Sequence, residues 1–325
     1  MGQYLDRLKD RFNMIDPSRY YLSYSGGKDS HLLYWFIKEY AKIDGIEIVG
    51  VDTFMEHDEI LQRIYKNSDV VLKPELTPFQ IKEKYGIPCF TKWQDSKIYR
   101  YQLGSRSDSL MNLVTRTNVI KFKLNKKASE LLLSGRLHKV SNKCDLFNKK
   151  KPLAKYERQS GRKPIIGVRG DESLSRKAVY TECFDSKGRF TPIYDLSDDM
   201  LKKIYSEYDI EIPTLYKYVD RTGCMGCPYG NHAGKDNVPK ELSLLSEEKR
   251  KQVIELFKES YDVLGIDYKN IKPTEYYTED KTICTCLQCG KQFKRLRDRK
   301  GMYCSNECQW DSMRKVRKIY PPNLK

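Results

Sequence analysis

Six residues near the N-terminus form the pattern best suited to hold a phosphate group. The string Ser25-Gly26-Gly27-Lys28-Asp29-Ser30 stands between a short aromatic and apolar run, 20–23, and a segment with apolar residues at helical spacing, 29–42. Two glycines at such a junction let the backbone approach a polyphosphate, and the free N–H groups of the helix point at the anion. The serines add hydroxyl donors and the lysine adds a charge. Glycines also serve ordinary turns, but the whole string after a strand predicts a phosphate loop.

A second pattern of this kind follows another apolar, strand-like run at 164–168. Gly167 and Gly170 flank Arg169, whose guanidinium presents a fork of donors suited to phosphate or sulfate oxygens. Glu172-Ser173 can begin a helix, which would place Arg176 one turn further along on the same face. An ordinary surface pair between arginine and glutamate is the alternative interpretation.

These two motifs resemble those of a known family of enzymes. The first string resembles the Ser-Gly-Gly-x-Asp-Ser loop of PP-loop ATP pyrophosphatases. Residues 167–176 resemble the Gly-x-Arg-x-x-Glu-Ser-x-x-Arg segment of the phosphoadenosine phosphosulfate (PAPS) reductase family, a branch of that superfamily. The resemblance continues at 191–199 and at the Gly-Cys-x-x-Cys segment within 221–228, so that it covers roughly residues 20–230.

The resemblance implies ATP or a PAPS-like adenine nucleotide that reacts at its α-phosphorus, with Mg²⁺ bridging its oxygens. Asp52 ends the second predicted strand and would lie near the nucleoside, although it also fits a turn residue that starts a helix. The expected nucleotide-binding residues are Ser25, Gly26, Gly27, Lys28, Asp29, Ser30, Asp52, Arg169, Glu172 and Ser173. The expected catalytic residues are Lys28, Asp29, Arg169 and Arg176, with Asp29 also a Mg²⁺ ligand and both arginines stabilising charge on the transferred group.

Four of the ten cysteines lie within this resemblance: Cys144, Cys183, Cys224 and Cys227. Thiolates are the usual ligands of iron–sulfur clusters, and a Cys-x-x-Cys turn supplies two of them. Adenylylsulfate reductases of the family carry a Cys-Cys pair where this chain has Lys143-Cys144. Resemblance to the cysteine-rich subunit of DNA phosphorothioation systems implies a [4Fe–4S] cluster on the four thiols. A redox-active pair, a zinc site and buried free thiols are the alternatives.

A second group of cysteines lies near the end of the chain. Cys286-x2-Cys289 and Cys304-x3-Cys308 are separated by fourteen residues. Two close pairs of this kind supply the four thiolates of a tetrahedral zinc site. The ion would contribute the folding energy of a unit too small for a core of its own. The sequence therefore predicts a zinc-ribbon-like module.

The positive charge is concentrated in two segments. The net charge is +16, and residues 121–163 hold 14 Lys and Arg against 3 Asp and Glu. Residues 284–325 hold 11 against 3, interleaved with Phe293, Tyr303 and Trp310. Concentrated charge with aromatic residues suits a nucleic-acid backbone with base stacking, so DNA or RNA is the expected partner. A solvated basic face, or a ribbon that docks a protein, is the alternative.

The elements that must position these residues alternate along the first ninety residues. Strand-like runs at 20–23, 46–51 and 70–72 alternate with helical patterns, which implies α/β architecture with a parallel sheet and right-handed crossovers. We expect a PP-loop domain of the adenine nucleotide alpha hydrolase type at 1–270, a linker at 271–283 and the zinc module at 284–325. The chain has no apolar run of eighteen residues and no signal peptide, so we expect no membrane contact and a cytoplasmic location.

Three functions fit these patterns. The first is an enzyme that acts at the α-phosphate by adenylation or sulfur transfer, on or near nucleic acid, with a possible sulfur-donor protein. The second is a PAPS or adenylylsulfate reductase, but the C-terminus lacks the Glu-Cys-Gly-Leu-His tail that carries the nucleophile of PAPS reductases. The third is a regulator that senses a nucleotide and binds nucleic acid without catalysis.

Overall fold

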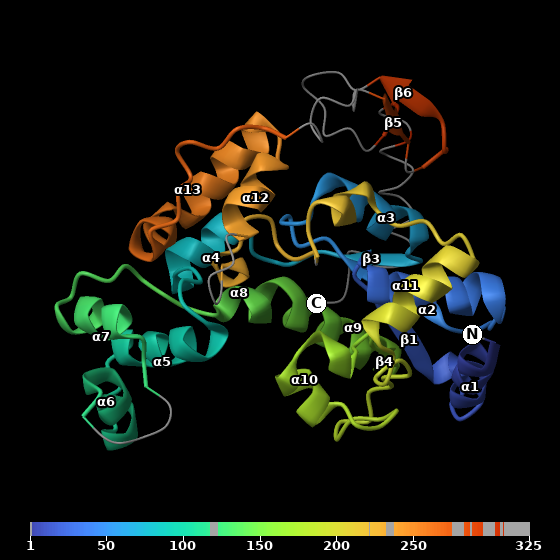
Figure 1. The fold of residues 1–325 in the computed structure, drawn as a ribbon, viewed down its shortest axis with the longest axis horizontal. Coiled ribbons are helices and arrows are strands. Elements are labelled where there is room, and N and C mark those ends of the chain that lie inside the picture. Colours follow the sequence, from blue (N-terminus) through green and yellow to red (C-terminus); the bar gives the residue numbers. More distant parts are fainter. Residues whose placement is uncertain are drawn as a thin grey trace.

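A four-stranded parallel sheet stands at the centre of the protein (Figure 1). The computed structural model describes residues 2–117, 123–220, 222–231, 237–274, 283–286, 288–294, 303–305 and 308. The strand order is β3-β2-β1-β4. This confirms the expected α/β class, a Rossmann-like sheet as in the adenine nucleotide alpha hydrolases. The strands are β1 (Tyr20–Tyr24), β2 (Glu47–Val51), β3 (Val70–Leu72) and β4 (Lys163–Ile165).

Each parallel pair needs a crossover, and helices supply it. Helix α2 (Lys28–Trp35), continued by the π-helical turn η2 (Phe36–Tyr40), connects β1 to β2, and α3 (Asp58–Asn67) connects β2 to β3. Leu22 of β1 and Ile48 of β2 are adjacent in register and fully buried in the main core. That burial fixes the register, because a slip of one residue would turn both side chains to the opposite face.

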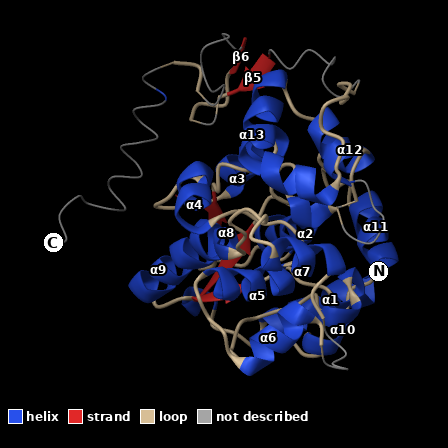
Figure 2. Ribbon diagram, turned by 90° about the vertical axis from the view of Figure 1, so that its left-hand side faces the viewer, coloured by secondary structure: helices blue, strands red, loops and turns tan. Residues whose placement is uncertain are grey.

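A long helical insertion separates β3 from β4 and holds a core of its own. Its apolar residues, from Cys89 to Val140, pack together as a separate cluster. Figure 2 shows how helices surround the sheet in a view turned by 90°. The insertion comprises α4 (Pro78–Tyr85), α5 (Lys92–Gln102), α6 (Asp108–Thr115), α7 (Lys126–Leu133), α8 (Lys143–Asp145), the π-helical turn η3 (Leu146–Lys150) and α9 (Lys151–Ser160).

The remaining helices complete the fold on either side of the sheet. Helix α1 (Gly2–Phe12) packs its buried face, including Leu5 and Leu8, into the main core. The chain after β4 forms α10 (Leu174–Val179), α11 (Asp198–Glu207), α12 (Asn237–Ser243) and α13 (Glu247–Leu264). Residues of the last two helices build a further core around Met225 and Tyr261.

Two antiparallel strands, β5 (Ile283–Thr285) and β6 (Gln292–Lys294), belong to the cysteine-rich end of the chain. Most of the linker expected at 271–283, and the basic stretches at 295–300 and 309–325, lie outside the described residues. The domain boundaries therefore stay a prediction. Among the described helices, none combines the length and the apolar character that a membrane span requires.

Candidate nucleotide pocket and cysteine sites

The predicted phosphate loop lies where a parallel sheet is expected to bind its ligand. The chain proceeds from β1 to β2 and β3 in one direction, whereas β4 lies on the other side of β1. Ligands bind at such a switch point, outside the carboxyl ends of the strands. Ser25 follows β1 directly, and Gly167 to Arg169 follow β4, so the topology brings the two predicted motifs to the same edge of the sheet.

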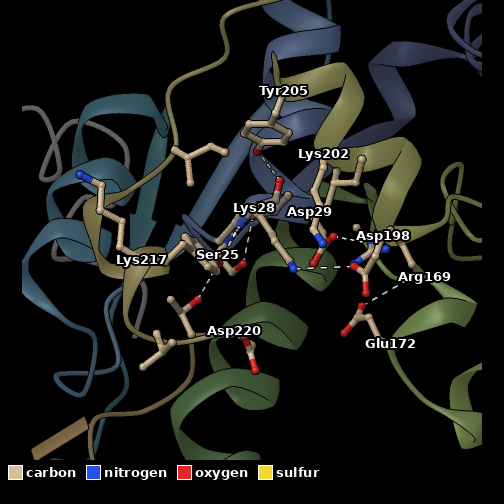
Figure 3. A pocket seen from close by; sticks show the side chains of 18 of the residues that line it. Ser25, Lys28, Asp29, Arg169, Glu172, Asp198, Lys202, Tyr205, Lys217 and Asp220 are labelled. Carbon is tan, nitrogen blue, oxygen red and sulfur yellow. Dashed lines mark hydrogen bonds and ion pairs between the residues drawn. The ribbon is translucent and has the colours of Figure 1, made fainter. Parts of the chain in front are cut away.

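One pocket of about 860 Å³ joins these motifs (Figure 3). That volume lies within the range of cofactor sites, roughly 300 to 1,000 Å³. Five basic and four acidic side chains line it, so phosphate charge can be balanced within the pocket. The lining includes the predicted residues Ser25, Gly27, Lys28, Asp29, Ser30, Gly167, Arg169, Glu172 and Arg176. It also includes Asp198, Lys202, Tyr205, Tyr216, Lys217, Asp220 and Thr222.

Two glycines are required by the way the pocket is built. Gly26 has φ +72°, and a Cβ there would lie 2.9 Å from the carbonyl oxygen of Ile60 on α3. A Cβ on Gly167 would lie 2.9 Å from both the carbonyl carbon of Asp29 and the backbone nitrogen of Ser30. Gly26 does not itself line the pocket, and it therefore shapes the loop instead of contacting a ligand.

Arg169 joins the phosphate loop to α11. Its side chain is only 1 % exposed. Nε donates to Asp29 Oδ1 at 2.5 Å, Nη2 donates to Asp198 Oδ1 at 2.7 Å, and Nη1 donates to the Leu196 carbonyl at 3.3 Å. Burial alone would raise the pKa of Asp198, but the hydrogen bond and the charge of Arg169 hold it below its usual range. Its donors already join the loop to α11, although the side chain also lines the pocket, so direct stabilisation of a transferred group by Arg169 stays a prediction.

Arg176 is the better placed cation for a ligand. Its side chain is 36 % exposed, lines the pocket and forms an ion pair with Glu172, four residues earlier. Ser173 does not line the pocket; its hydroxyl accepts a hydrogen bond from the backbone nitrogen of Arg176 and caps α10. Lys28 Nζ lies 3.7 Å from Asp198 Oδ1, so this carboxylate also orients the loop lysine.

Two tyrosines that the sequence analysis missed fix the start of α2. The Tyr216 hydroxyl accepts from the backbone nitrogen of Lys28 at 3.0 Å and lies 3.1 Å from Thr222 Oγ1. The Tyr205 hydroxyl donates to the carbonyl of Lys28 at 2.6 Å. Tyr216 thus occupies one of the N–H positions that the phosphate loop offers to an anion. No motif marked either residue, because the chain holds 24 tyrosines without a distinctive pattern.

Asp52 does not line this pocket, and its predicted place near the nucleoside stays a prediction. Its carboxylate accepts from the backbone nitrogen of Phe54 at 3.0 Å and from the Tyr65 hydroxyl at 2.8 Å. Its side chain is buried, and it is not among the residues that line the pocket. The turn-forming role that the sequence left open is the one the structure shows, because an aspartate readily bonds the backbone two residues ahead.

Cys144, Cys224 and Cys227 lie in one buried region, but among the described residues their sulfurs are not all within 4.8 Å of one another, as those of the C-terminal group are. The thiols of Cys144, Cys224 and Cys227 influence one another electrostatically. Burial and the neighbouring Cys224 raise the pKa of Cys144 to about 12. Cys183 instead packs against the main core near Arg11 and Asp195, so the structure gives no support for a set of four thiols that includes it. Sequence spacing could not reveal this, because Cys183 follows α10 on the far side of β4.

A lysine accompanies the three inner thiols. The neighbouring Cys224 raises the pKa of Lys149, although burial alone would lower it. Burial raises the pKa of Cys224, and the positive charge of Lys149 partly offsets that rise. Backbone hydrogen bonds hold the Cys-x-x-Cys turn: Met225 donates to the Met55 carbonyl at 2.7 Å, and Gly226 donates to Glu241 at 2.9 Å. Iron–sulfur clusters are usually held by four cysteine thiolates, so these three thiols could hold one only together with a further ligand.

The C-terminal cysteines form a group with metal-site geometry. The Sγ atoms of Cys286, Cys289, Cys304 and Cys308 all lie within 4.8 Å of one another. Cys289 and Cys304 are 3.5 Å apart at sulfur, and Cys304 and Cys308 are 3.6 Å apart. Tetrahedral zinc with Zn–S bonds of about 2.3 Å places its sulfurs roughly 3.8 Å apart. The four thiols therefore could hold one metal ion, such as zinc or an iron–sulfur centre.

Comparison with known proteins adds no assignment: no protein-family model matches the chain, and no curated protein matches it. What this chain does must therefore be argued from the pocket and the two cysteine groups. What the comparisons and the fold support together is an α/β domain with a parallel sheet of order β3-β2-β1-β4, joined to a C-terminal four-cysteine group.

Proposed function

We propose that this protein is an adenine-nucleotide-dependent enzyme that acts at the α-phosphate of ATP or a PAPS-like nucleotide, on or near nucleic acid. One observation carries the proposal. A single pocket lies at the switch point of the parallel sheet. Its lining includes residues of the Ser-Gly-Gly-Lys-Asp-Ser loop, Gly167 and Arg176. The parallel topology brings both motifs to this edge, and the charged and hydroxyl side chains that they place in one pocket suit a bound polyphosphate.

In this proposal each side chain has a defined task. The backbone at Gly27 and the hydroxyls of Ser25 and Ser30 bind phosphate oxygens, and Lys28 supplies a positive charge. Arg176 stabilises the charge that develops on the transferred group. Arg169 acts as a positioning residue, because it holds Asp29 and Asp198 in place.

The bond changes are those of nucleotidyl transfer. An acceptor oxygen forms a bond to the α-phosphorus, the bond to the bridging oxygen breaks, and pyrophosphate leaves with that electron pair. Mg²⁺, when bound, would neutralise phosphate charge, and carboxylates suit it as ligands. Asp29 and Asp220 in the pocket wall offer such oxygens.

The three inner thiols extend the proposal from adenylation to sulfur transfer. Thr222 lines the nucleotide pocket, and Cys224 follows two residues later on the same segment. If a sulfur-donor protein loads one of these thiols as a persulfide, its terminal sulfur can attack the activated carbon of the acceptor, and AMP leaves with the electron pair of the broken C–O bond. A second thiol then attacks the inner sulfur, which forms a disulfide between the two cysteines and releases the thiolated acceptor. An iron–sulfur centre on Cys144, Cys224 and Cys227 would give the protein a broad absorbance when it is purified without oxygen, and Cys224→Ala would remove it.

The test is nucleotide turnover. ATP is supplied with Mg²⁺ and an oligonucleotide acceptor, and pyrophosphate and AMP are measured over time. Lys28→Ala combined with Ser30→Ala should abolish pyrophosphate release, whereas Lys251→Ala on the exposed part of α13 should not alter it. Sulfite release from PAPS or adenylylsulfate would instead indicate a reductase. Tight nucleotide binding without any turnover would indicate a regulator.

A further inference from the structure

Aromatic rings and lysines alternate on the surface formed by α4 and η3. The rings of Tyr85 and Phe147 stack with their centroids 4.6 Å apart and their planes inclined by 22°. Lys84 Nζ lies 5.5 Å from the centre of the Tyr85 ring, and Lys151 Nζ lies 4.2 Å from the centre of the Phe147 ring. Both rings are only partly buried, and both lysines are exposed.

The same arrangement continues on α5. Trp93 is 41 % exposed, and Lys97 Nζ lies 5.9 Å from the centre of its ring. Six residues after Trp93, and on a different side of α5, the Tyr99 ring lies 5.2 Å from Lys143 Nζ, which comes from α8. The exposed part of the Trp93 ring is area on which an unpaired base could stack.

A hydrogen bond and an ion pair hold the start of α5 beside α8. Asn142 Nδ2 donates to the carbonyl of Lys92 at 3.1 Å, and Lys92 Nζ lies 3.3 Å from Asp145 Oδ1. Helices α4 and α8 also pack against each other, and Figure 1 shows α4, α5 and α8 as neighbours. We call this the aromatic–lysine surface; it comprises Lys84, Tyr85, Trp93, Lys97, Tyr99, Lys143, Phe147 and Lys151.

We propose that the aromatic–lysine surface binds single-stranded nucleic acid. Proteins that bind single strands combine a positive track for the backbone with rings on which unpaired bases stack. A duplex offers its phosphates but keeps its bases stacked on each other, so exposed rings would gain nothing from it. The surface lies within and beside the most basic part of the described chain, 123–163, which supplies the complementary charge.

The surface also leads to the proposed reaction centre. Cys144 lies between Lys143, which contacts the Tyr99 ring, and Asp145, which pairs with Lys92. A strand bound along α5 and η3 would therefore pass close to the segment that carries Cys144. This inference rests on the proposed function for its biological meaning, but binding itself can be measured without nucleotide.

The experiment measures binding of a fluorescein-labelled 20-nucleotide single strand, and of the duplex of the same sequence, to the full chain without ATP. Trp93→Ala should weaken single-strand binding about fivefold or more, because stacking on one ring contributes about 1 to 3 kcal/mol. Trp93→Phe keeps a ring and should stay within about twofold. Lys97→Ala should reduce the slope of log affinity against log salt by about 0.7, whereas Trp93→Ala should leave the slope unchanged.

The charge control is Lys251→Ala on α13, which should bind as the unaltered chain does. Thermal unfolding of each variant verifies that the fold is intact. Equal affinity of Trp93→Ala and the unaltered chain would overturn the proposal, as would duplex binding that is as tight and equally sensitive to Trp93→Ala. If the chain releases pyrophosphate but does not bind a single strand, this inference is overturned and the proposed function stands. If the chain binds a single strand but does not turn over nucleotide, the proposed function is overturned and this inference stands.

Discussion

The two arginines of the nucleotide pocket should respond to mutation in opposite ways. Arg169 is buried and donates to two carboxylates and one carbonyl, whereas Arg176 is partly exposed and forms an ion pair with Glu172. Arg169→Gln should therefore lower the free energy of unfolding, and Arg176→Gln should lower turnover with little change in stability. The sequence motif alone gave both arginines the same task.

The expected change in the free energy of unfolding depends on the contacts that each substitution removes and on how buried the remaining partners are. Hydrogen bonds to charged groups contribute about 1.5 to 3 kcal/mol each, and removing one partner of a fully buried pair costs about 3 to 5 kcal/mol. Asp198 is 47 % exposed and regains water when Arg169 is removed, which reduces the loss. We expect Arg169→Gln to destabilise the protein by about 2 to 4 kcal/mol. Arg176→Gln should cost about 0.5 kcal/mol or less, as exposed pairs do.

Urea unfolding followed by tryptophan fluorescence gives the stability, and pyrophosphate release gives the turnover. We expect Arg176→Gln to reduce kcat roughly a hundredfold, the lower range for loss of one donor to developing charge. Arg176→Lys should recover part of that loss. Arg169→Gln with unaltered stability but abolished turnover would refute the assignment of Arg169 as a positioning residue. Unaltered turnover of Arg176→Gln would refute its place at the reacting phosphate.

Three further predictions test other parts of the structure. Gly167→Ala should weaken nucleotide binding, measured by titration, about tenfold or more, because its Cβ would lie 2.9 Å from the loop backbone. The control is Gly230→Ala, whose Cβ would meet only side chains at 3.8 Å and which should bind nucleotide normally. Burial, with Arg63 and Lys66, lowers the pKa of His31 from 6.5 to about 3, so the folded chain keeps this ring neutral while the unfolded chain protonates it. The free energy of unfolding that this neutral ring contributes is present above pH 6.5 and is lost as the pH falls, by about 2 kcal/mol at pH 5. Urea unfolding at pH 7 and at pH 5 should show this loss in the unaltered chain and not in His31→Asn. An equal loss in both proteins would contradict the prediction. Metal analysis should find about one zinc per chain on the C-terminal thiols, and Cys289→Ser should reduce that content; an unchanged zinc content would place the metal elsewhere.

The sequence was a good guide wherever a local pattern determines the structure. The β-branched residues of β2 and β3 and the glycine pair of the phosphate loop predicted the strands and the loop, because burial on both faces and close backbone approach demand those residue types. Helix α4 shows another such local pattern, with Pro78 in its first turn and Thr77 as its cap.

The sequence was a poor guide wherever a contact joins distant segments. Asp52 and Cys183 have residue types suited to the predicted sites, yet one completes a turn and the other packs beside Arg11. Tyr216 reaches the start of α2 across 188 residues, and no spacing rule relates the two positions. Such pairings depend on how the helical insertion and α11 pack onto the sheet, which is a tertiary property.

Identification of the nucleotide products tests the central claim most directly. The full chain is incubated with ATP, Mg²⁺ and a single-stranded oligonucleotide, and the products are separated by ion-exchange chromatography. Reaction at the α-phosphate predicts pyrophosphate, with adenylate either free as AMP or attached to the acceptor, and the loss of both products in Lys28→Ala/Ser30→Ala. Formation of ADP and inorganic phosphate, or turnover that survives the double substitution, would contradict it.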